Sequence, residues 1–280
     1  MSGQRSTGGV LGSADGDGLE HLARVGLVSY GVVHLLVAWL ALQLAWGSSS
    51  ESADQSGAMA TLAETPVGKP LLWIIAIGMI ALAVWQALEV LRWRSGWSAS
   101  GDQRSTAVKK SVKALAKAVV YAALAVLAIR FATGSGSGSS GSQQQQQTAT
   151  GVFGWPGGRW LVGAAGLVII GVGVYLVYKG VTKHFLKEID LAEAPPSAVR
   201  LVTRLGQVGY PGKGIALAVV GGLFVHAAVT FDPADASGLD GALRTILEAP
   251  FGQFLLTLVA LGIAAFGAYL FVRARYPERT

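Results

Sequence analysis

Residues 57–72 read GAMATLAETPVGKPLL, and residues 241–256 read GALRTILEAPFGQFLL. The two stretches keep Gly, Ala, Thr, Glu, Pro, Gly and a Leu pair in the same register. A weaker copy, PGGRWLV, occupies residues 156–162. Three copies of one pattern in a single chain indicate a protein built from internal repeats. The fold is therefore expected to consist of three similar units.

The composition indicates a membrane protein rather than a soluble one. Hydrophobic residues make up 52% of the 280 residues and charged residues only 14%, against about 25% charged in ordinary soluble domains. The mean hydropathy is +0.50. The apolar residues gather into blocks of roughly 20 residues, the length that crosses a bilayer. We therefore expect six transmembrane helices, at residues 25–46, 70–91, 114–133, 160–179, 212–231 and 253–273.

Lysine and arginine residues lie at alternate ends of these apolar blocks. The connections after the second and fourth blocks are rich in both residues, whereas the other three connections hold few. The positive-inside rule then places both termini in the cytoplasm and the loops with the repeated pattern outside. The net charge of +6 is spread over these ends rather than gathered on one patch, which argues against a nucleic-acid partner. The lipid bilayer is the expected partner.

Each repeat is expected to be a pair of spans joined by an outer loop. We place the repeats at residues 19–97, 98–190 and 191–276, after a disordered amino-terminal tail at 1–18. Units with an even number of spans insert the same way up, so the three hairpins are parallel and predict a pseudo-threefold bundle. The Gly/Ser/Gln composition of residues 134–151 predicts a flexible loop in the second repeat.

Small residues recur at every fourth position of the predicted fifth span, at Gly214, Ala218 and Gly222. Such a stripe lets two helix backbones approach closely in lipid, where no hydrophobic force drives helix association. We therefore expect these three residues to pack against a neighbouring helix. In the first and third outer loops, apolar residues at helical spacing predict short amphipathic helices within 57–66 and 239–249.

The repeats resemble the "domain of unknown function 1206" family of bacterial membrane proteins. The resemblance implies six spans in three pairs in a bacterial inner membrane, with no assigned activity and no residue roles to transfer. The chain departs from the family pattern at His34, where an aromatic residue is expected, and in the second outer loop. The residues that carry the resemblance are Arg24-Val25-Gly26, residues 58–68 with the following Leu pair, PGGRWLVG at 156–163, and residues 235–243 with Pro250-Phe251-Gly252.

Polar residues within the predicted spans are the candidates for a pathway or cavity. The register between repeats matches His34 with Tyr121 and Leu217, so these side chains are expected to face one central axis. A haem shared by His34 and His226 is not expected, because the same register separates them by about 13 Å of membrane depth. The alternative is that both are packing histidines that form hydrogen bonds.

Gln86 and Glu89 are the remaining candidates for the mouth of a cavity. They lie three residues apart and therefore on one face of the second span. The alternative for Glu89 is an ion pair with Arg92 on the same helix.

Sequence patterns that support catalysis are absent. The chain has no cysteine, no Gly-x-Ser-x-Gly, no His-Glu-x-x-His and no phosphate loop. We therefore expect no enzyme activity, and we assign no catalytic, cofactor-binding or metal-binding residues.

Two functions stay open. The first is a transporter, channel or small-solute-binding protein whose pathway runs between the repeats and whose solute is unknown. The second is a membrane scaffold or envelope accessory protein that meets a membrane-protein partner through its outer helices. Buried polar residues converging on one cavity favour the first function. An exposed apolar patch on 57–66 or 239–249 favours the second.

Overall fold

The computed structural model describes residues 11–47, 51–98, 100–136, 141–192 and 194–276. Among these residues, six helices are long and apolar enough to cross a membrane. The prediction of an all-α membrane protein with six spans is confirmed, and short helices lie in the first and third outer loops as expected. The elements are α1 (Leu11–Ala45), α2 (Gln55–Ala63), α3 (Gly68–Trp93), η1 (Arg94–Ser98), α4 (Asp102–Ala132), α5 (Gly141–Phe153), α6 (Gly158–Val181), η2 (His184–Glu188), α7 (Pro196–Thr230), η3 (Pro233–Asp235), α8 (Leu239–Glu248) and α9 (Gly252–Arg275), where η marks a 3-10 helix.

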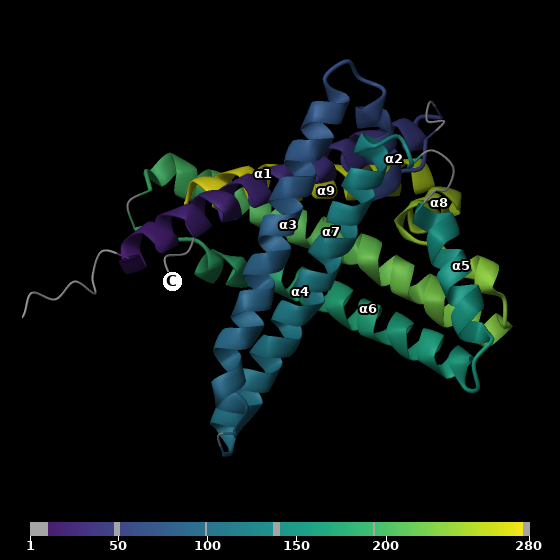
Figure 1. The fold of residues 1–280 in the computed structure, drawn as a ribbon. Coiled ribbons are helices and arrows are strands. Elements are labelled where there is room, and N and C mark those ends of the chain that lie inside the picture. The colour runs from purple at the N-terminus through teal and green to yellow at the C-terminus, as the bar shows by residue number, and fades with distance from the viewer. Residues whose placement is uncertain (1–10, 48–50, 99, 137–140, 193, 277–280) are drawn as a thin grey trace, which may run out of the picture.

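The long helices pack in three pairs, and each pair joins two repeats (Figure 1). The second helix of each repeat lies against the first helix of the next: α3 against α4, α6 against α7, and α9 against α1. The link from α3 to α4 spans residues 94–101 and the link from α6 to α7 spans residues 182–195, so in both pairs the chain turns back and the two helices pack as antiparallel neighbours. This cyclic order is the pseudo-threefold relation expected of three parallel repeats. Within the repeats, α1 also packs on α3 and α7 on α9, whereas α4 and α6 form no packed pair.

The two ends of the helix bundle carry different short helices. We call the end with α2, α5 and α8 the loop end, and the end with η1 and η2 the link end. At the loop end, Asp240 of α8 accepts hydrogen bonds from the backbone N–H of Ala53 at 2.7 Å and from Arg244 Nε at 2.8 Å. Asp54 caps α2 by accepting from the N–H groups of Ser56 and Gly57. The bond from Ala53 therefore joins α8 to the segment just before α2, and Asp54 holds the start of α2 itself.

The repeated Pro-x-Gly pattern marks the turn into the second helix of each repeat. Gly68, Gly158 and Gly252 are the first residues of α3, α6 and α9. A Cβ atom on any of them would overlap a carbonyl oxygen of the short helix just before it. Only glycine fits there without moving the short helix, so the turn itself explains why this residue recurs in all three copies.

Glycines also let the paired helices approach at equivalent points of the cycle. Gly31 of α1 faces Gly267 of α9, and a Cβ added to either would lie 3.0 Å from the carbonyl oxygen of the other. Gly214 of α7 holds the repeat position of Gly31 and faces Gly173 of α6, with a corresponding distance of 2.6 Å. Such close backbone contact is how helices associate in lipid.

The predicted small-residue stripe on α7 is wrong at one position. Gly214 and Ala218 lie against the backbone of α6, but the next contact is made by Gly221, where an added Cβ would lie 2.6 Å from an α6 carbonyl oxygen. A Cβ added to Gly222 meets no atom within 4 Å. The reason is helix geometry: at 3.6 residues per turn, residue 221 and not 222 returns to the face of Gly214 after two turns.

Two segments predicted to lack structure are helical. Residues 11–18 are part of α1, and residues 1–10 of the predicted tail lie outside the described residues. Residues 141–151 belong to α5 rather than to a flexible loop. Glutamine is a good helix former, and Gln146 Nε2 donates a hydrogen bond to the carbonyl oxygen of Ala234 at 2.8 Å. The glutamine run is therefore an ordered part of the loop end.

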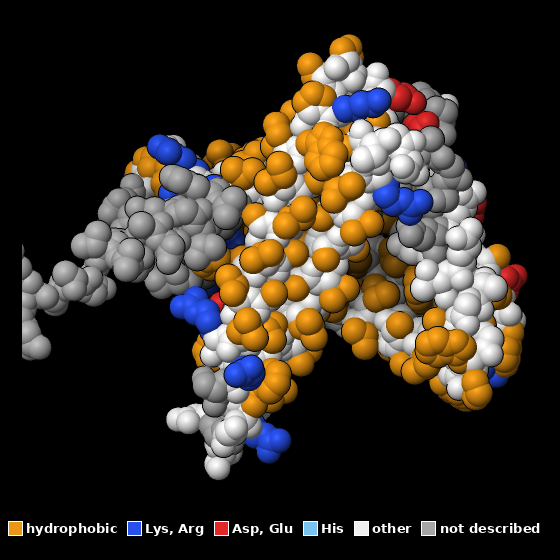
Figure 2. All heavy atoms as spheres, viewed as in Figure 1, with side chains coloured by type: hydrophobic (Ala, Val, Ile, Leu, Met, Phe, Trp, Pro, Cys, Tyr) orange, Lys and Arg blue, Asp and Glu red, His pale blue; other side chains and the backbone are white. Residues whose placement is uncertain are grey.

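The outer faces of the long helices suit a lipid environment. In Figure 2 apolar side chains cover α3 and α4 along their length, and Lys and Arg side chains lie near the ends of the pair. Trp73, Ile77 and Val119 are among the exposed apolar side chains. The short helices behave differently, because no large apolar side chain of α2 or α8 is exposed. Their apolar faces are turned toward the bundle.

Candidate functional site

Lys213 is the middle residue of the 35-residue helix α7. The predicted fifth span begins at residue 212, one residue before Lys213, whereas α7 begins at Pro196 and contains Pro211 in its interior. Gly180 of α6 leaves the space that the proline ring occupies, and a proline is tolerated in a membrane helix where neighbouring helices surround it. Lys213 therefore lies inside the membrane-spanning part of the chain rather than at its end.

The ammonium group of Lys213 donates hydrogen bonds to two side chains of α1. Its Nζ lies 2.8 Å from Tyr30 Oη and 3.2 Å from His34 Nε2. The other ring nitrogen of His34, Nδ1, lies 2.9 Å from the carbonyl oxygen of Tyr30, and a carbonyl oxygen can only accept. Nδ1 therefore carries the hydrogen and Nε2 accepts from Lys213, so this arrangement requires a neutral imidazole.

Aromatic rings pack around this contact. Lys213 Nζ lies 4.2 Å from the ring centroid of Phe266 and 4.9 Å from that of Tyr30, distances at which a ring face attracts a cation. The Tyr30 ring meets Tyr121 of α4 edge-on, with 5.5 Å between the centroids. Within the described ranges, Lys213 contacts no carboxylate.

The three repeats supply equivalent residues to this cluster. The register that matches His34 with Tyr121 and Leu217 also matches the residues one turn earlier, which are Tyr30, Lys117 and Lys213. Lys213 and Tyr30 thus meet as counterparts from the third and first repeats. Tyr121 joins them from the second repeat through its contact with Tyr30. The first helices of all three repeats therefore converge here.

A cavity of about 150 Å³ lies beside Lys213 and His34. Gln55 of α2 and Gln145 of α5 also line it, so it extends from the middle of α7 toward the loop end. A mostly apolar cavity with a few convergent polar groups is typical of small-molecule sites. The apolar lining consists of Val37, Ala216, Leu217, Val220, Leu239 and Ile263.

A second charged cluster lies toward the link end, around Glu188 of η2. Its Oε1 lies 2.7 Å from Lys179 Nζ and 3.9 Å from Lys113 Nζ, and its Oε2 lies 3.2 Å from Arg273 Nη1. Burial alone would raise the pKa of Glu188, but the cations of Arg273 and Lys179 outweigh burial and lower that pKa to about 2. Glu188 is therefore ionised at neutral pH and ties η2 to α4, α6 and α9.

Two of the residues predicted for a cavity mouth lie away from the Lys213 cavity. Glu89 Oε1 accepts a hydrogen bond from Trp93 Nε1 at 2.7 Å, and its Oε2 lies 3.7 Å from Arg92 Nη1 on the same helix. This is the ion pair given as the alternative for Glu89. Gln86 is half-buried one turn earlier on α3 and does not line the cavity.

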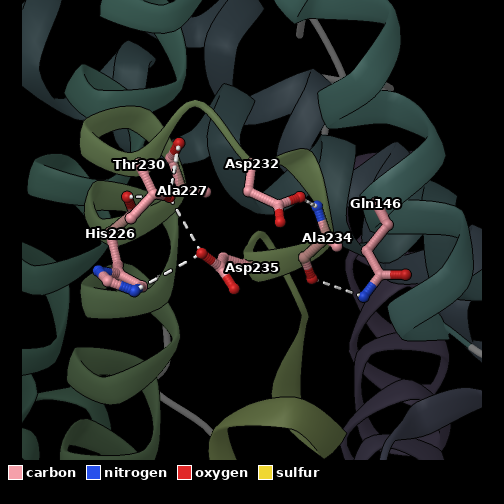
Figure 3. Close-up of polar contacts among 7 residues, drawn as sticks. All are labelled: Gln146, His226, Ala227, Thr230, Asp232, Ala234 and Asp235. Carbon is pink, nitrogen blue, oxygen red and sulfur yellow. Dashed lines mark hydrogen bonds and ion pairs between the residues drawn. The ribbon is translucent and has the colours of Figure 1, made fainter.

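His226 lies near the loop end of α7, where Figure 3 shows it directed toward Asp235. Its Nε2 is 3.5 Å from Asp235 Oδ2, and Thr230 Oγ1 donates to the same oxygen at 3.0 Å. The side chain is 60% exposed, so His226 holds the loop after α7 and does not reach His34. Throughout the described part of the chain, no group of three or more His, Asp or Glu residues is placed to hold a metal ion.

Lys213 is the residue that the sequence prediction missed. The predicted span of 212–231 leaves Lys213 at the end of the span, because proline and glycine usually mark the end of a helix. The repeat register could have placed Lys213 within a span, because it matches Lys213 with Tyr30, which lies inside the predicted first span, 25–46. A position that is inside one repeat is expected to be inside its counterpart as well.

Comparison with known proteins gives three matches to one family. The sequence profile described as Domain of Unknown Function (DUF1206) matches residues 25–92, 112–183 and 208–277, and each match includes one of Tyr30, Lys117 and Lys213. The uncharacterized protein YxxB of Bacillus subtilis (strain 168) is 30% identical over 262 residues, which cover 94% of this chain and 92% of that protein. No solved structure matches the chain.

Proposed function

The chain belongs to the DUF1206 family, and we propose that this multi-pass membrane protein is a non-enzymatic transporter or channel that binds a small solute between its repeats. The observation that carries the proposal is the cavity beside Lys213, on which polar side chains from different repeats converge. Ionisable side chains are costly inside a membrane and mark substrate or ion pathways when they occur there. Lys213 is such a side chain, and it lines a cavity large enough for a solute.

The scaffold function has less support. It requires an apolar surface on the outer short helices to meet a membrane-protein partner, but α2 and α8 expose no large apolar side chain. Met59, Leu62 and Leu243 face the core instead. The short helices act in the proposal as a cover for the loop end of the cavity, to which α2, α5 and α8 each contribute one lining residue.

The proposed location is a bacterial cell membrane with both termini in the cytoplasm. The loop end carries few basic residues, namely Lys69, Arg159 and Arg244 in the connections and Arg130 near the end of α4. The links at the opposite end are rich in Lys and Arg. The positive-inside rule therefore puts the link end in the cytoplasm and the loop end outside.

The test uses the absence of cysteine from the chain. Leu217 lines the cavity, whereas Ile215, two residues earlier on α7, is 47% exposed on the outer face. In lipid nanodiscs we expect Leu217→Cys to react with a small neutral methanethiosulfonate, because the reactive thiolate forms only where water reaches it. Ile215→Cys, at nearly the same depth but facing lipid, should react at the background rate. Equal rates for the two variants would contradict the proposal.

A further inference from the structure

We propose that the cavity beside Lys213 binds a small monocarboxylate with a short apolar chain, and that Lys213 is its counter-ion. This inference rests on the proposed function and names the chemical class of the solute. It is carried by the contacts of Lys213, by the hydrogen-bond donors beside the cavity, and by the size and lining of the cavity.

The charge of Lys213 lacks a partner of opposite sign in the part of the chain that the structure describes. Its Nζ contacts a phenol oxygen, a neutral imidazole and two ring faces. Lys179, by contrast, lies 2.7 Å from the carboxylate of Glu188. A charge inside a membrane protein is costly unless a partner neutralises it. A bound anion would supply the partner that the described residues do not.

A hydrogen-bond donor remains for such an anion. An ammonium group has three N–H donors, and Lys213 uses two of them, on Tyr30 and His34. Tyr30 accepts from Lys213 and does not line the cavity, so the third N–H donor of Lys213, which does line it, is left for a solute. A carboxylate accepts through two oxygens, and its hydrogen bonds to a cation are shorter and stronger than those between neutral groups.

The rest of the cavity suits a short apolar chain better than an inorganic ion. Apart from Gln55 and Gln145 toward the loop end, this part of the lining is apolar. Its side chains, such as Leu217, Val220 and Ile263, offer no hydrogen bond to a hydrated ion. Its volume of about 150 Å³ is that of an apolar protein cavity known to hold one benzene molecule. A benzene-sized space holds about six non-hydrogen atoms, which is the size of a carboxylate with about four carbon atoms such as butyrate.

Positive charge continues from the cavity toward the link end. Lys117 lies one turn before Tyr121 on α4, and Tyr121 contacts Tyr30. Beyond it, the cations of Lys113, Lys179 and Arg273 face the single carboxylate of Glu188. An excess of one sign of charge along a pathway raises the local concentration of solutes of the other sign. This favours anions over cations.

The test measures how solutes slow the reaction of Leu217→Cys with the neutral methanethiosulfonate. The three solutes are sodium butyrate, butyramide and sodium chloride at equal concentrations. Butyrate and butyramide have nearly the same shape and differ in charge, and sodium chloride controls for ionic strength. We expect butyrate alone to slow the reaction, in a manner that saturates with concentration.

Lysine variants made in the Leu217→Cys protein test whether protection by butyrate depends on Lys213. Lys213→Met should weaken protection by butyrate about tenfold or more, the loss expected when a charged hydrogen-bond partner is removed. Lys213→Arg should keep the preference for the anion. Lys69→Met removes an equal charge from the exposed start of α3 and should leave protection unchanged. If Lys213→Met fails to fold, the comparison of butyrate with butyramide still tests whether the cavity prefers the carboxylate.

The outcomes separate this inference from the proposed function. Equal slowing by butyrate and butyramide, equal slowing by chloride, or no slowing would overturn the carboxylate site. In those cases a fast reaction of unprotected Leu217→Cys would still support a solvated pathway. A Leu217→Cys variant that reacts no faster than Ile215→Cys would overturn the proposed function and this inference together.

Discussion

Lys179 and Lys213 show how differently the same side chain is held in this bundle. Lys179 is paired with Glu188 at 2.7 Å, and that carboxylate also contacts Arg273 of α9 and Lys113 of α4. Among the described residues, the partners of Lys213 on α1 and α9 are all neutral. The first lysine joins helices, and the second leaves its charge available beside a cavity. We therefore expect the two lysines to respond to different perturbations.

The first prediction concerns Glu188 and acid. The folded-state pKa of Glu188 is about 2 and its ordinary value is 4.5, so Glu188 stabilises the fold above pH 4.5 and this stability is lost as the pH falls toward 2. The shift corresponds to about 3 kcal/mol at neutral pH. Glu188→Gln should therefore lower the melting temperature at pH 7 and lower it much less at pH 3. Measured in detergent, an equal loss at both pH values would contradict the ion-pair cluster.

A matched control separates Glu188 from the other carboxylates. Glu248, at the end of α8, is exposed, and exposed charges contribute little to stability. Glu248→Gln should leave the melting temperature of the protein nearly unchanged at both pH values.

At the residue scale, sequence reasoning found part of the candidate site. His34 was singled out as a polar residue inside a span, and the register matched it with Tyr121 and Leu217. The structure places His34 and Leu217 on one cavity, and Tyr121 in the adjoining aromatic cluster. Lys213 was not found because helix continuation through Pro211 depends on neighbours in α6 that a single sequence does not reveal.

At the element scale, the long helices could be predicted because each is a block of apolar residues of bilayer length. The face that each helix packs against its neighbour could not be predicted in the same way. The stripe on α7 was assigned by counting in fours, but the structure selects Gly221 over Gly222. Helix α5 was missed because Gly and Ser suggested a flexible segment, whereas its glutamines contact the loop before α8. Both errors depend on tertiary contacts.

The second prediction tests the face of α7. A Cβ on Gly221 would lie 2.6 Å from the carbonyl oxygen of Gly166 on α6, whereas a Cβ on Gly222 meets nothing within 4 Å. Gly221→Ala should lower the free energy of unfolding by about 1–3 kcal/mol, the usual cost of overpacking. Gly222→Ala, the matched control, should be neutral or slightly stabilising, since alanine favours helix. Equal melting temperatures in detergent would show that this face of α7 does not pack.

At the scale of the whole molecule, the repeats order the helices but do not pack as separate hairpins. The sequence pattern defines each repeat by its outer loop, yet the closest pairs are α3 with α4, α6 with α7, and α9 with α1. The repeat count and the parallel orientation follow from periodicity alone. Periodicity does not predict the partner of each long helix, because apolar helices of similar composition carry no complementary charge pattern. In the structure, Gly31 and Gly214 let their helices approach α9 and α6 closely.

The third prediction concerns orientation. Thr65 and Thr245 are exposed at the loop end, and Ser98 and Ser197 are exposed at the link end. As single cysteines in intact cells, the two loop-end variants should react with a membrane-impermeant maleimide. The two link-end variants should react only after lysis. The reverse pattern would place the link end outside and contradict the proposed cytoplasmic location of the termini.

The most direct test of a pathway between the repeats is the sidedness of labelling at Leu217. Leu217→Cys and Ile215→Cys would be treated in sealed right-side-out and inside-out vesicles with the anionic reagent 2-sulfonatoethyl methanethiosulfonate. A pathway that carries small anions predicts that Leu217→Cys reacts from both faces and Ile215→Cys from neither. Leu217→Cys that stays unreactive from both faces would contradict the pathway.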